Sequence, residues 1–317
     1  MDSSMISQKA QLAIHGKKRI KTRIYKNRYL YMMLIPGFIY LLLFKYLPMA
    51  GIVIAFQDYN IFKGIGGSPW VGFGQFAKLF QMPDFPMVLR NTFLISMYRT
   101  IFAFPIPIVI ALLLNEVGNQ KLKKSLQTIV FAPYLISWVV ISSITIALLS
   151  PVTGLTKYIS DLFGGTPVLY LADKRYFRSI VVLTYIWRNT GWYTVFYMAT
   201  LASIPSEMYE SAAIDGASRI KQLWYITLPS LKSTVVILLI LECGSIMDAG
   251  FEQVFAMLTP AVRTVGEIID TFVYDMGLQQ MDFSYAAAAG VFKSVIGMVF
   301  ILATNHLANR MDERGLW

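Results

Sequence analysis

Apolar residues gather in six long runs that are separated by shorter polar segments. A helix needs about 20 apolar residues to cross a bilayer core of about 30 Å, and each run approaches or exceeds that length. The pattern therefore predicts an all-α polytopic membrane protein with six transmembrane helices. The first run can extend to Phe56, because Lys45 and Pro48 interrupt it without a turn strong enough to start a second span. The expected spans are residues 29–49, 91–114, 125–149, 179–202, 233–251 and 283–307.

Lysine and arginine are distributed unequally among the segments that connect the runs. Cytoplasmic segments of membrane proteins hold the excess of both residues. Sixteen lysines and arginines lie in the tails at residues 1–28 and 309–317 and in the second and fourth loops. The other three loops together hold seven. We therefore expect both termini and the loop at residues 203–232 to face the cytoplasm, with residues 29–308 as one membrane domain.

The composition supports a membrane protein and excludes several chemistries. Apolar residues make up 56% of the chain and charged residues only 15%, whereas a soluble protein has about a quarter charged. The net charge of +10 is not gathered into a patch with aromatic residues, as nucleic-acid binding requires. A single Cys243 excludes a disulfide within the chain, and two histidines, His15 and His306, leave little for metal or general-base chemistry. The first 28 residues show no secretory signal, so the first run is expected to remain as a signal anchor.

The loop at residues 203–232 predicts two short helices joined at a glycine turn. Pro205 and Ser206 indicate a helix start, with Ser206 as the N-cap. Gly216 can adopt a positive φ, which allows the chain to reverse into a second helix from about Ala217. Pro229 is expected to end that second helix before the fifth span begins.

The same loop has a smooth surface beside an apolar one. Its alanines, Ala212, Ala213 and Ala217, leave room for another protein to approach the backbone closely. Apolar side chains recur at helical spacing in the second helix, which gives it an apolar face. The pattern fits either a protein-docking site or an amphipathic loop at the membrane interface. The apolar positions are Ile220, Leu223, Trp224 and Ile226.

The loop resembles the Glu-Ala-Ala loop of binding-protein-dependent ABC permeases. That pattern is Glu-Ala-Ala, two residues, Asp-Gly-Ala, five residues, an aromatic, two residues, Ile, one residue and Leu-Pro. Ser211 replaces the first alanine and Leu223 replaces the aromatic, with Trp224 adjacent, and both changes keep a small or apolar character. The positions in register are Glu210, Ala212, Asp215, Gly216, Ala217, Ile226, Leu228 and Pro229.

The resemblance implies a non-catalytic permease subunit with the type I ABC importer fold, in which this loop couples to an ATPase subunit. Glu210 and Asp215 would face basic or backbone groups of the ATPase cleft, and Gly216 would set the angle between the helices. Ala212 and Ala217 would permit close seating. The other positions that the resemblance assigns to coupling are Leu223, Trp224 and Pro229.

The resemblance also implies the assembly around the chain. Segments such as residues 248–255, 267–274 and 292–297 are similar to the sugar-importing branch of the family, the maltose and complex-polysaccharide permeases. The expected partners are a second related permease in a heterodimer, two ATP-binding subunits, an extracytoplasmic solute-binding protein, an oligosaccharide and the lipid of a bacterial cytoplasmic (inner) membrane. The sequence has no Gly-x-x-x-x-Gly-Lys-Ser/Thr phosphate loop, so no cofactor or metal is expected on this chain, and ATP and Mg²⁺ would be bound by the partner subunits.

Charged side chains within the spans are candidates for the substrate pathway, because such groups cost several kcal/mol unless they pair or line a wet cavity. Arg99, Arg188, Glu242 and Lys293 are expected about 13–15 Å from the outer ends of their spans, with Asp248 nearer the outside. Two interpretations remain open. Either Arg188 or Lys293 pairs with Glu242 or Asp248 to hold helices together, or the two cations offset the carboxylates of a uronate-type sugar.

The fourth span also carries aromatic and hydroxyl groups on one helix face. Trp187, Thr190, Tyr193 and Tyr197 follow one another at spacings of three, three and four residues, and Asn189 lies beside them. Such groups suit a sugar, although Trp and Tyr near a membrane interface are more often anchors. We expect Tyr193 and Tyr197 to lie too deep for anchors and to face a cavity.

Two other classes of protein compete with the importer. A secondary carrier driven by an ion gradient would need no ATPase, and Glu242 and Asp248 could carry its coupling protons. It gives no reason for the pattern of the loop at residues 203–232. A membrane enzyme should show clustered acidic or histidine residues near the interface, and the sequence shows none.

Overall fold

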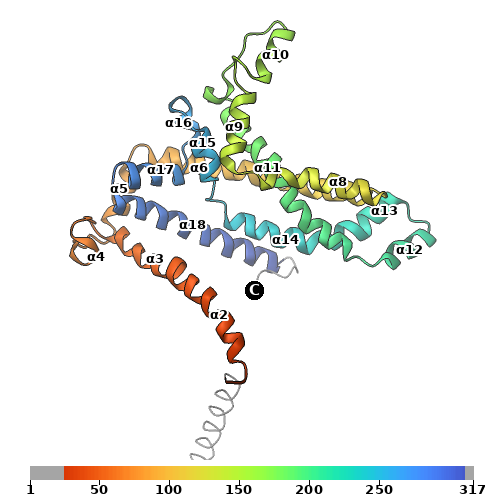
Figure 1. Ribbon diagram of the computed structural model, residues 1–317, viewed down its shortest axis with the longest axis horizontal. Coiled ribbons are helices and arrows are strands. Elements are labelled where there is room, and N and C mark those ends of the chain that lie inside the picture. The colour runs from red at the N-terminus through yellow and green to blue at the C-terminus, as the bar shows by residue number, and fades with distance from the viewer. Residues whose placement is uncertain (1–24, 311–317) are drawn as a thin grey trace, which may run out of the picture. The chain divides into compact units, whose positions relative to one another are not determined.

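The computed structural model describes residues 25–310, and these residues are almost entirely helical (Figure 1). Within them the β-structure is one isolated bridge between Gln57 and Trp70. The chain divides into two compact units, Met1–Val53 and Ile54–Trp317. The basic tail expected at residues 1–28 and the tail expected at 309–317 lie mostly outside the described residues.

The first apolar run forms a continuous helical segment, Arg28–Phe56, as the sequence allows. Lys45 lies in a π turn, and Pro48 follows at the start of the next α-helical turn. The wider π turn relieves the clash that a proline ring makes with the preceding helical turn. The segment consists of α2 (Arg28–Leu41), η1 (Leu42–Tyr46), α3 (Leu47–Met49) and η2 (Ala50–Phe56).

Long helices form the centre of the second unit (Figure 1). In this unit α11 packs against α6, α7 and α14, and α14 packs against α18. A buried cluster that includes Ala111, Tyr197 and Leu231 joins α7, α11 and α14. The long helices are α6 (Phe85–Ala103), α7 (Pro105–Asn115), α11 (Phe177–Ala202), α14 (Leu228–Gly244) and α18 (Phe283–Arg310).

The connecting segments of the second unit contain short helices, several of which pack on the long ones. Ile95, Phe177 and Val254 belong to one buried cluster, which fixes α15 (Phe251–Met257) against α6 and α11. The other short elements are α4 (Gly64–Gly67), α5 (Gly74–Gln81), α10 (Leu155–Leu162), η4 (Tyr170–Ala172), η6 (Pro260–Val262), α16 (Arg263–Gly266), α17 (Ile269–Tyr274) and η7 (Asp275–Gln279).

Four helical segments of the described chain are long and apolar enough to cross a membrane. A fifth span is obtained if a pair of helices bent by 98° counts as one. The remaining expected span, residues 179–202, corresponds to α11, whose 26 residues are long enough but less apolar. The six-span count therefore stays a prediction. The four segments are Arg28–Phe56, Phe85–Asn115, Arg219–Gly244 and Phe283–Arg310.

Two of the expected spans are broken, although the sequence predicted uninterrupted helices. The third consists of α8 (Gln120–Phe131) with η3 (Ala132–Leu135), followed after the 98° bend by α9 (Trp138–Leu148). The fifth ends at Gly244, short of the expected residue 251, and Gly250 has a φ of 79° before α15 begins. Irregular backbone at membrane depth is tolerated only where protein buries it or where it lines a cavity. Both breaks are therefore candidate positions for a binding site.

Candidate functional site

The loop between α11 and α14 forms a helical hairpin with a glycine turn, as predicted. Its first arm is α12 (Ser206–Ile214), and Gly216 follows with a φ of 76°. The amide of Ala217 donates to the carbonyl of Ala212 at 2.8 Å, and that of Gly216 donates to Ala213 at 3.1 Å. These two bonds make a Schellman motif, which needs a residue with positive φ at its centre. The expected N-cap is shifted by one residue, because Pro205 is the cap and Ser206 is the first helical residue.

The second arm of the hairpin continues into the fifth span without a stop. The Ser218 hydroxyl caps α13 (Arg219–Gln222), which leads through the π turn η5 (Leu223–Thr227) into α14. The prediction that Pro229 ends the second helix is wrong. As with Pro48 in the first run, a π turn precedes the proline and lets the helix pass through it. The second arm and α14 therefore form one continuous helical segment, Arg219–Gly244.

Side-chain contacts hold the hairpin to its own base and leave its tip free. Tyr209 and Thr227 share a hydrogen bond of 3.0 Å between their hydroxyl groups. Large apolar side chains are nevertheless exposed near the turn, including Ile214 at 87% and Tyr225 at 80%. Of the expected coupling residues, Glu210, Asp215, Gly216, Trp224 and Pro229 are exposed, whereas Ala212, Ala217 and Leu223 are half-buried.

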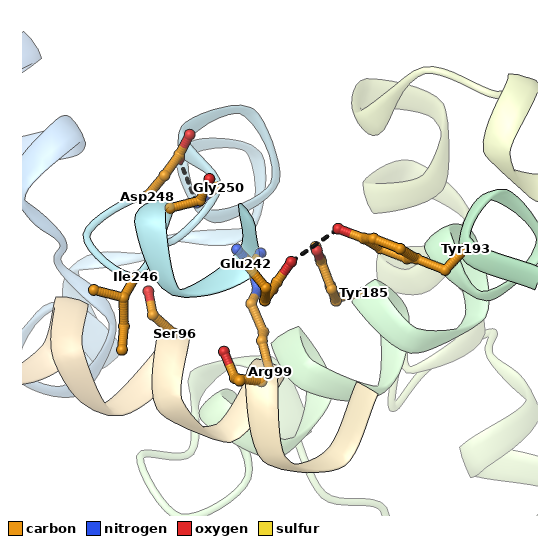
Figure 2. A pocket seen from close by; sticks show the side chains of 10 residues that line it. Ser96, Arg99, Tyr185, Tyr193, Glu242, Ile246, Asp248 and Gly250 are labelled. Atoms are coloured by element: carbon orange, nitrogen blue, oxygen red, sulfur yellow. Dashed lines mark hydrogen bonds between the residues drawn. The ribbon is translucent and has the colours of Figure 1, made fainter. Parts of the chain in front are cut away.

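The second candidate site is a cavity of about 220 Å³ at the break after α14 (Figure 2). It lies among α6, α11 and the non-helical segment that precedes α15. The sequence predicted Arg99, Tyr193, Glu242 and Asp248 as pathway residues, and the structure brings these four together. The lining residues are Ser96, Arg99, Thr100, Tyr185, Tyr193, Glu242, Ser245, Ile246, Asp248 and Gly250.

Arg99 is the best-buried charged group of the cavity, with 3% of its surface exposed. Its Nη2 donates to Oε1 of Gln253, and its guanidinium lies 4.3 Å from the centre of the Tyr185 ring. Gln253 in turn donates from Nε2 to the Val181 carbonyl at 2.7 Å and to the Thr184 hydroxyl at 2.6 Å. Arg99 therefore links α6 to α15, and Gln253 extends that link to α11.

The two carboxyl groups of the cavity have partners of their own (Figure 2). The Tyr193 hydroxyl donates to Oε2 of Glu242 at 2.8 Å. Asp248 accepts a bond of 3.2 Å from the amide of Gly250. Glu242 lies two residues before the end of α14, not nine or ten residues inside a span, because the helix ends at Gly244. It reaches the depth of Arg99 only because the chain breaks there.

Of the two interpretations of Arg188 and Lys293, pairing with Glu242 or Asp248 is not found within residues 25–310. Lys293 donates to both carboxyl oxygens of Asp270, at 2.6 and 2.8 Å, and so ties α18 to α17. Burial raises the pKa of Asp270, and the nearby Lys293 ammonium opposes that rise. Arg188 donates from Nε to the Ile136 carbonyl at 3.0 Å. The sequence could not identify either partner, because Asp270 and Ile136 are distant in the chain from the residues they meet.

The aromatic and hydroxyl stripe of α11 divides among different environments. Tyr193 lines the cavity, whereas Tyr197 is fully buried in the apolar cluster with Ala111 and does not line the cavity. Thr190 and Asn189 donate to carbonyls one turn earlier on their own helix. Trp187 is 48% exposed. Residues three or four positions apart do not fall on the same line along a helix of about 3.6 residues per turn. The residues of the stripe therefore do not all face one cavity.

The two residues that hold the Arg99 guanidinium, Tyr185 and Gln253, were not singled out from the sequence. Tyr185 precedes Tyr193 by two helical turns on the same face, and that spacing could have identified it. Gln253 was expected in an outer loop, and no sequence signal marked it. It reaches Arg99 only because α15 folds back against α6 and α11.

Replacing Gly250 by alanine is expected to disturb the cavity. An added Cβ would lie 2.5 Å from Nη2 and 2.7 Å from Nη1 of Arg99, and a positive φ is unfavourable for alanine. Because Gln253 holds the guanidinium in place, we expect a loss of about 1–3 kcal/mol. Thermal unfolding of the purified complex measures the loss. Gly290→Ala, where nothing lies within 4 Å, is the matched control, and equal stability of the two variants would contradict this account.

Comparison with known proteins gives the family. Residues 103–313 match the family model described as "Binding-protein-dependent transport system inner membrane component". The chain belongs to this family. It is an integral component of an inner-membrane transport system that works with a solute-binding protein. An ion-coupled secondary carrier is not favoured.

Known proteins align with this permease over nearly its whole length. It is 44% identical over 95% of its length to the polygalacturonan/rhamnogalacturonan transport system permease protein YteP of Bacillus subtilis (strain 168), of which 94% is covered. It is 43% identical over 92% to protein LplB of the same organism, of which 92% is covered. A chain in the crystal structure of a bacterial alginate ABC transporter, in complex with an alginate pentasaccharide-bound periplasmic protein, aligns with a TM-score of 0.86 and 34% identity. That alignment covers 94% of this permease and all of the other chain.

Proposed function

We propose that this permease forms half of the translocation pathway of an ATP-driven importer for uronate-type, acidic oligosaccharides. One similar protein is named for polygalacturonan and rhamnogalacturonan transport. A similar solved structure belongs to a transporter that imports the acidic polysaccharide alginate. These relatives favour an anionic sugar polymer over a neutral one.

The observation that carries the ATP-driven part of the proposal is the exposed hairpin at Gly216. Its turn is fixed by a Schellman motif, its apolar side chains lack a cover, and its second arm is continuous with α14. These are the properties of an element that transmits movement from a docked protein to a transmembrane helix. The residues in register from Glu210 to Pro229 favour an ATPase subunit as that protein.

The assembly that we propose contains a second, related permease, two ATP-binding subunits and an extracytoplasmic solute-binding protein. ATP and Mg²⁺ are bound by the ATP-binding subunits, and this permease carries no catalytic residue. Both termini and the hairpin lie on the cytoplasmic side, in accordance with the excess of lysine and arginine there. The oligosaccharide passes between the two permeases, along a path that includes the cavity at Arg99.

Uptake into membrane vesicles tests the proposal. Vesicles that contain the complete importer are expected to accumulate labelled uronate oligosaccharide when ATP is present on the cytoplasmic side and the binding protein on the other. A protonophore, which abolishes the proton gradient, should leave this uptake unchanged. Uptake that needs a proton gradient and no ATP would refute the ATP-driven part, and competition only by neutral oligosaccharides would refute the substrate class.

A further inference from the structure

A guanidinium group without a counter-charge lies near the middle of α11. Arg188 is half-buried, 11 residues after the first residue of a 26-residue helix. Its Nε donates to the carbonyl of Ile136, which is freed by the bend between η3 and α9. Within residues 25–310 its two terminal nitrogens make no hydrogen bond or ion pair. The Nε bond fixes the side chain and leaves the two-pronged end of the guanidinium available.

The other two cations expected at a similar depth, Arg99 and Lys293, have polar side-chain partners. Arg99 is bonded to Gln253 and lies in a cavity with Glu242 and Asp248, and Lys293 is bonded to Asp270. Arg188 differs because the groups around it are a carbonyl and aromatic rings. A cation in a transmembrane helix is costly unless it meets water or an anion. The two terminal nitrogens of Arg188 therefore need water or an anion, because no side chain within residues 25–310 pairs with them.

Aromatic rings surround Arg188 in two stacked pairs. Its guanidinium carbon lies 4.5 Å from the centre of the Trp138 ring and 5.3 Å from that of Tyr134. Tyr134 stacks on Trp192 with centres 4.7 Å apart and planes 13° apart. Trp138 stacks on Tyr185 at 6.4 Å and 12°. Because Tyr185 also lines the cavity at Arg99, the ring groups reach from Arg188 to that cavity.

We propose that Arg188 and the rings of Tyr134 and Trp138 form a subsite for one uronate residue of the transported oligosaccharide. The free prongs of the guanidinium match a carboxylate, which accepts two parallel hydrogen bonds from arginine. The rings of Tyr134 and Trp138 hold the guanidinium through cation–π contacts and give the carboxylate site an apolar border against which the sugar can pack. This inference rests on the proposed function, since it names the group that neutralises an acidic substrate in the membrane.

Carboxylate recognition can be tested with the complete importer and its binding protein in vesicles. We expect Arg188→Gln to raise the concentration of uronate oligosaccharide for half-maximal ATPase stimulation at least about tenfold, the value of a charge-assisted hydrogen bond. Arg188→Lys keeps the charge and loses the two-pronged geometry, so it should give a smaller rise. Tyr134→Leu removes a ring and should also weaken the response. Arg175→Gln is the control, because Arg175 is exposed and paired with Asp173, and its response should be unchanged.

The outcomes separate this inference from the function on which it rests. An unchanged half-maximal concentration in Arg188→Gln, with wild-type importer responding to uronates, overturns the subsite and leaves the importer intact. Wild-type importer that responds only to neutral sugars refutes the proposed function itself. Separation of the two permeases in Arg188→Gln, seen by size-exclusion chromatography, would assign the counter-charge to the partner permease and overturn the inference. An assembled Arg188→Gln complex with a weaker uronate response supports it.

Discussion

Gly216→Pro is expected to abolish substrate uptake while the permease stays in the membrane. Proline fixes φ near −65° and has no amide hydrogen, whereas Gly216 has a φ of 76° and donates to Ala213. Proline also disfavours the helical backbone of the residue before it, and Asp215 has φ −71° and ψ 3°. The turn between α12 and α13 must therefore change its direction, so the hairpin no longer presents its two arms to an ATPase together. Uptake of labelled oligosaccharide in vesicles measures the loss.

Graded substitutions at the same position separate turn geometry from general damage. Asparagine tolerates the left-handed region, so Gly216→Asn should retain most of the uptake. Alanine fits the open space around Gly216 but costs about 1–2 kcal/mol in this backbone conformation, so Gly216→Ala should be intermediate. Full uptake in Gly216→Pro would show that the turn does not couple to transport.

Arg99→Met is expected to destabilise the permease by about 1.5–3 kcal/mol, the usual contribution of a buried hydrogen bond to a charged group. The substitution leaves Oε1 of Gln253 without its donor and removes the cation that faces Glu242 and Asp248. It also removes the side-chain hydrogen bond between α6 and α15. Denaturation of the detergent-purified complex, followed by intrinsic fluorescence, measures the change.

The control for Arg99 is an arginine at the surface. Arg175→Met removes an exposed ion pair with Asp173, and such pairs contribute little to stability because solvent screens them. Arg99→Lys restores the charge without the planar donor pair, so it should recover part of the stability. Similar stability of Arg99→Met and wild type would show that Gln253 and the carboxyl groups find other partners.

Local pattern was sufficient for the hairpin and insufficient for the broken spans. A positive φ at Gly216 follows from the residue itself, because few other residues adopt it at low cost. The breaks at Ile136 and after Gly244 were not predicted, because apolar residues stand on both sides of each break and the runs were defined by their length. Each break persists because tertiary contacts satisfy it. Arg188 bonds the freed Ile136 carbonyl, and α15 is fixed by a buried cluster and by Gln253.

The partners of the membrane charges were likewise beyond the sequence. Four predicted pathway residues meet in one cavity, which the depth argument anticipated for Arg99 and Tyr193. The depth predicted for Glu242 was wrong, because the fifth span was expected to continue as a helix to residue 251 and α14 ends at Gly244. The pairings of Lys293 with Asp270 and of Arg99 with Gln253 join segments far apart in the chain. The pattern of residues along one helix does not indicate which residues of other segments will contact it.

The sequence by itself determined that this protein is a helical membrane component with a helical hairpin that turns at Gly216, because hydrophobic length and turn chemistry are local properties. Only the tertiary structure decided which charges are neutralised. Ion pairs and aromatic contacts depend on side chains from different helices meeting at one point, and helix packing alone brings them there. The consequence is specific: within the described chain Arg99 and Lys293 have side-chain partners, whereas Arg188 is bonded only through Nε and lies beside two aromatic rings.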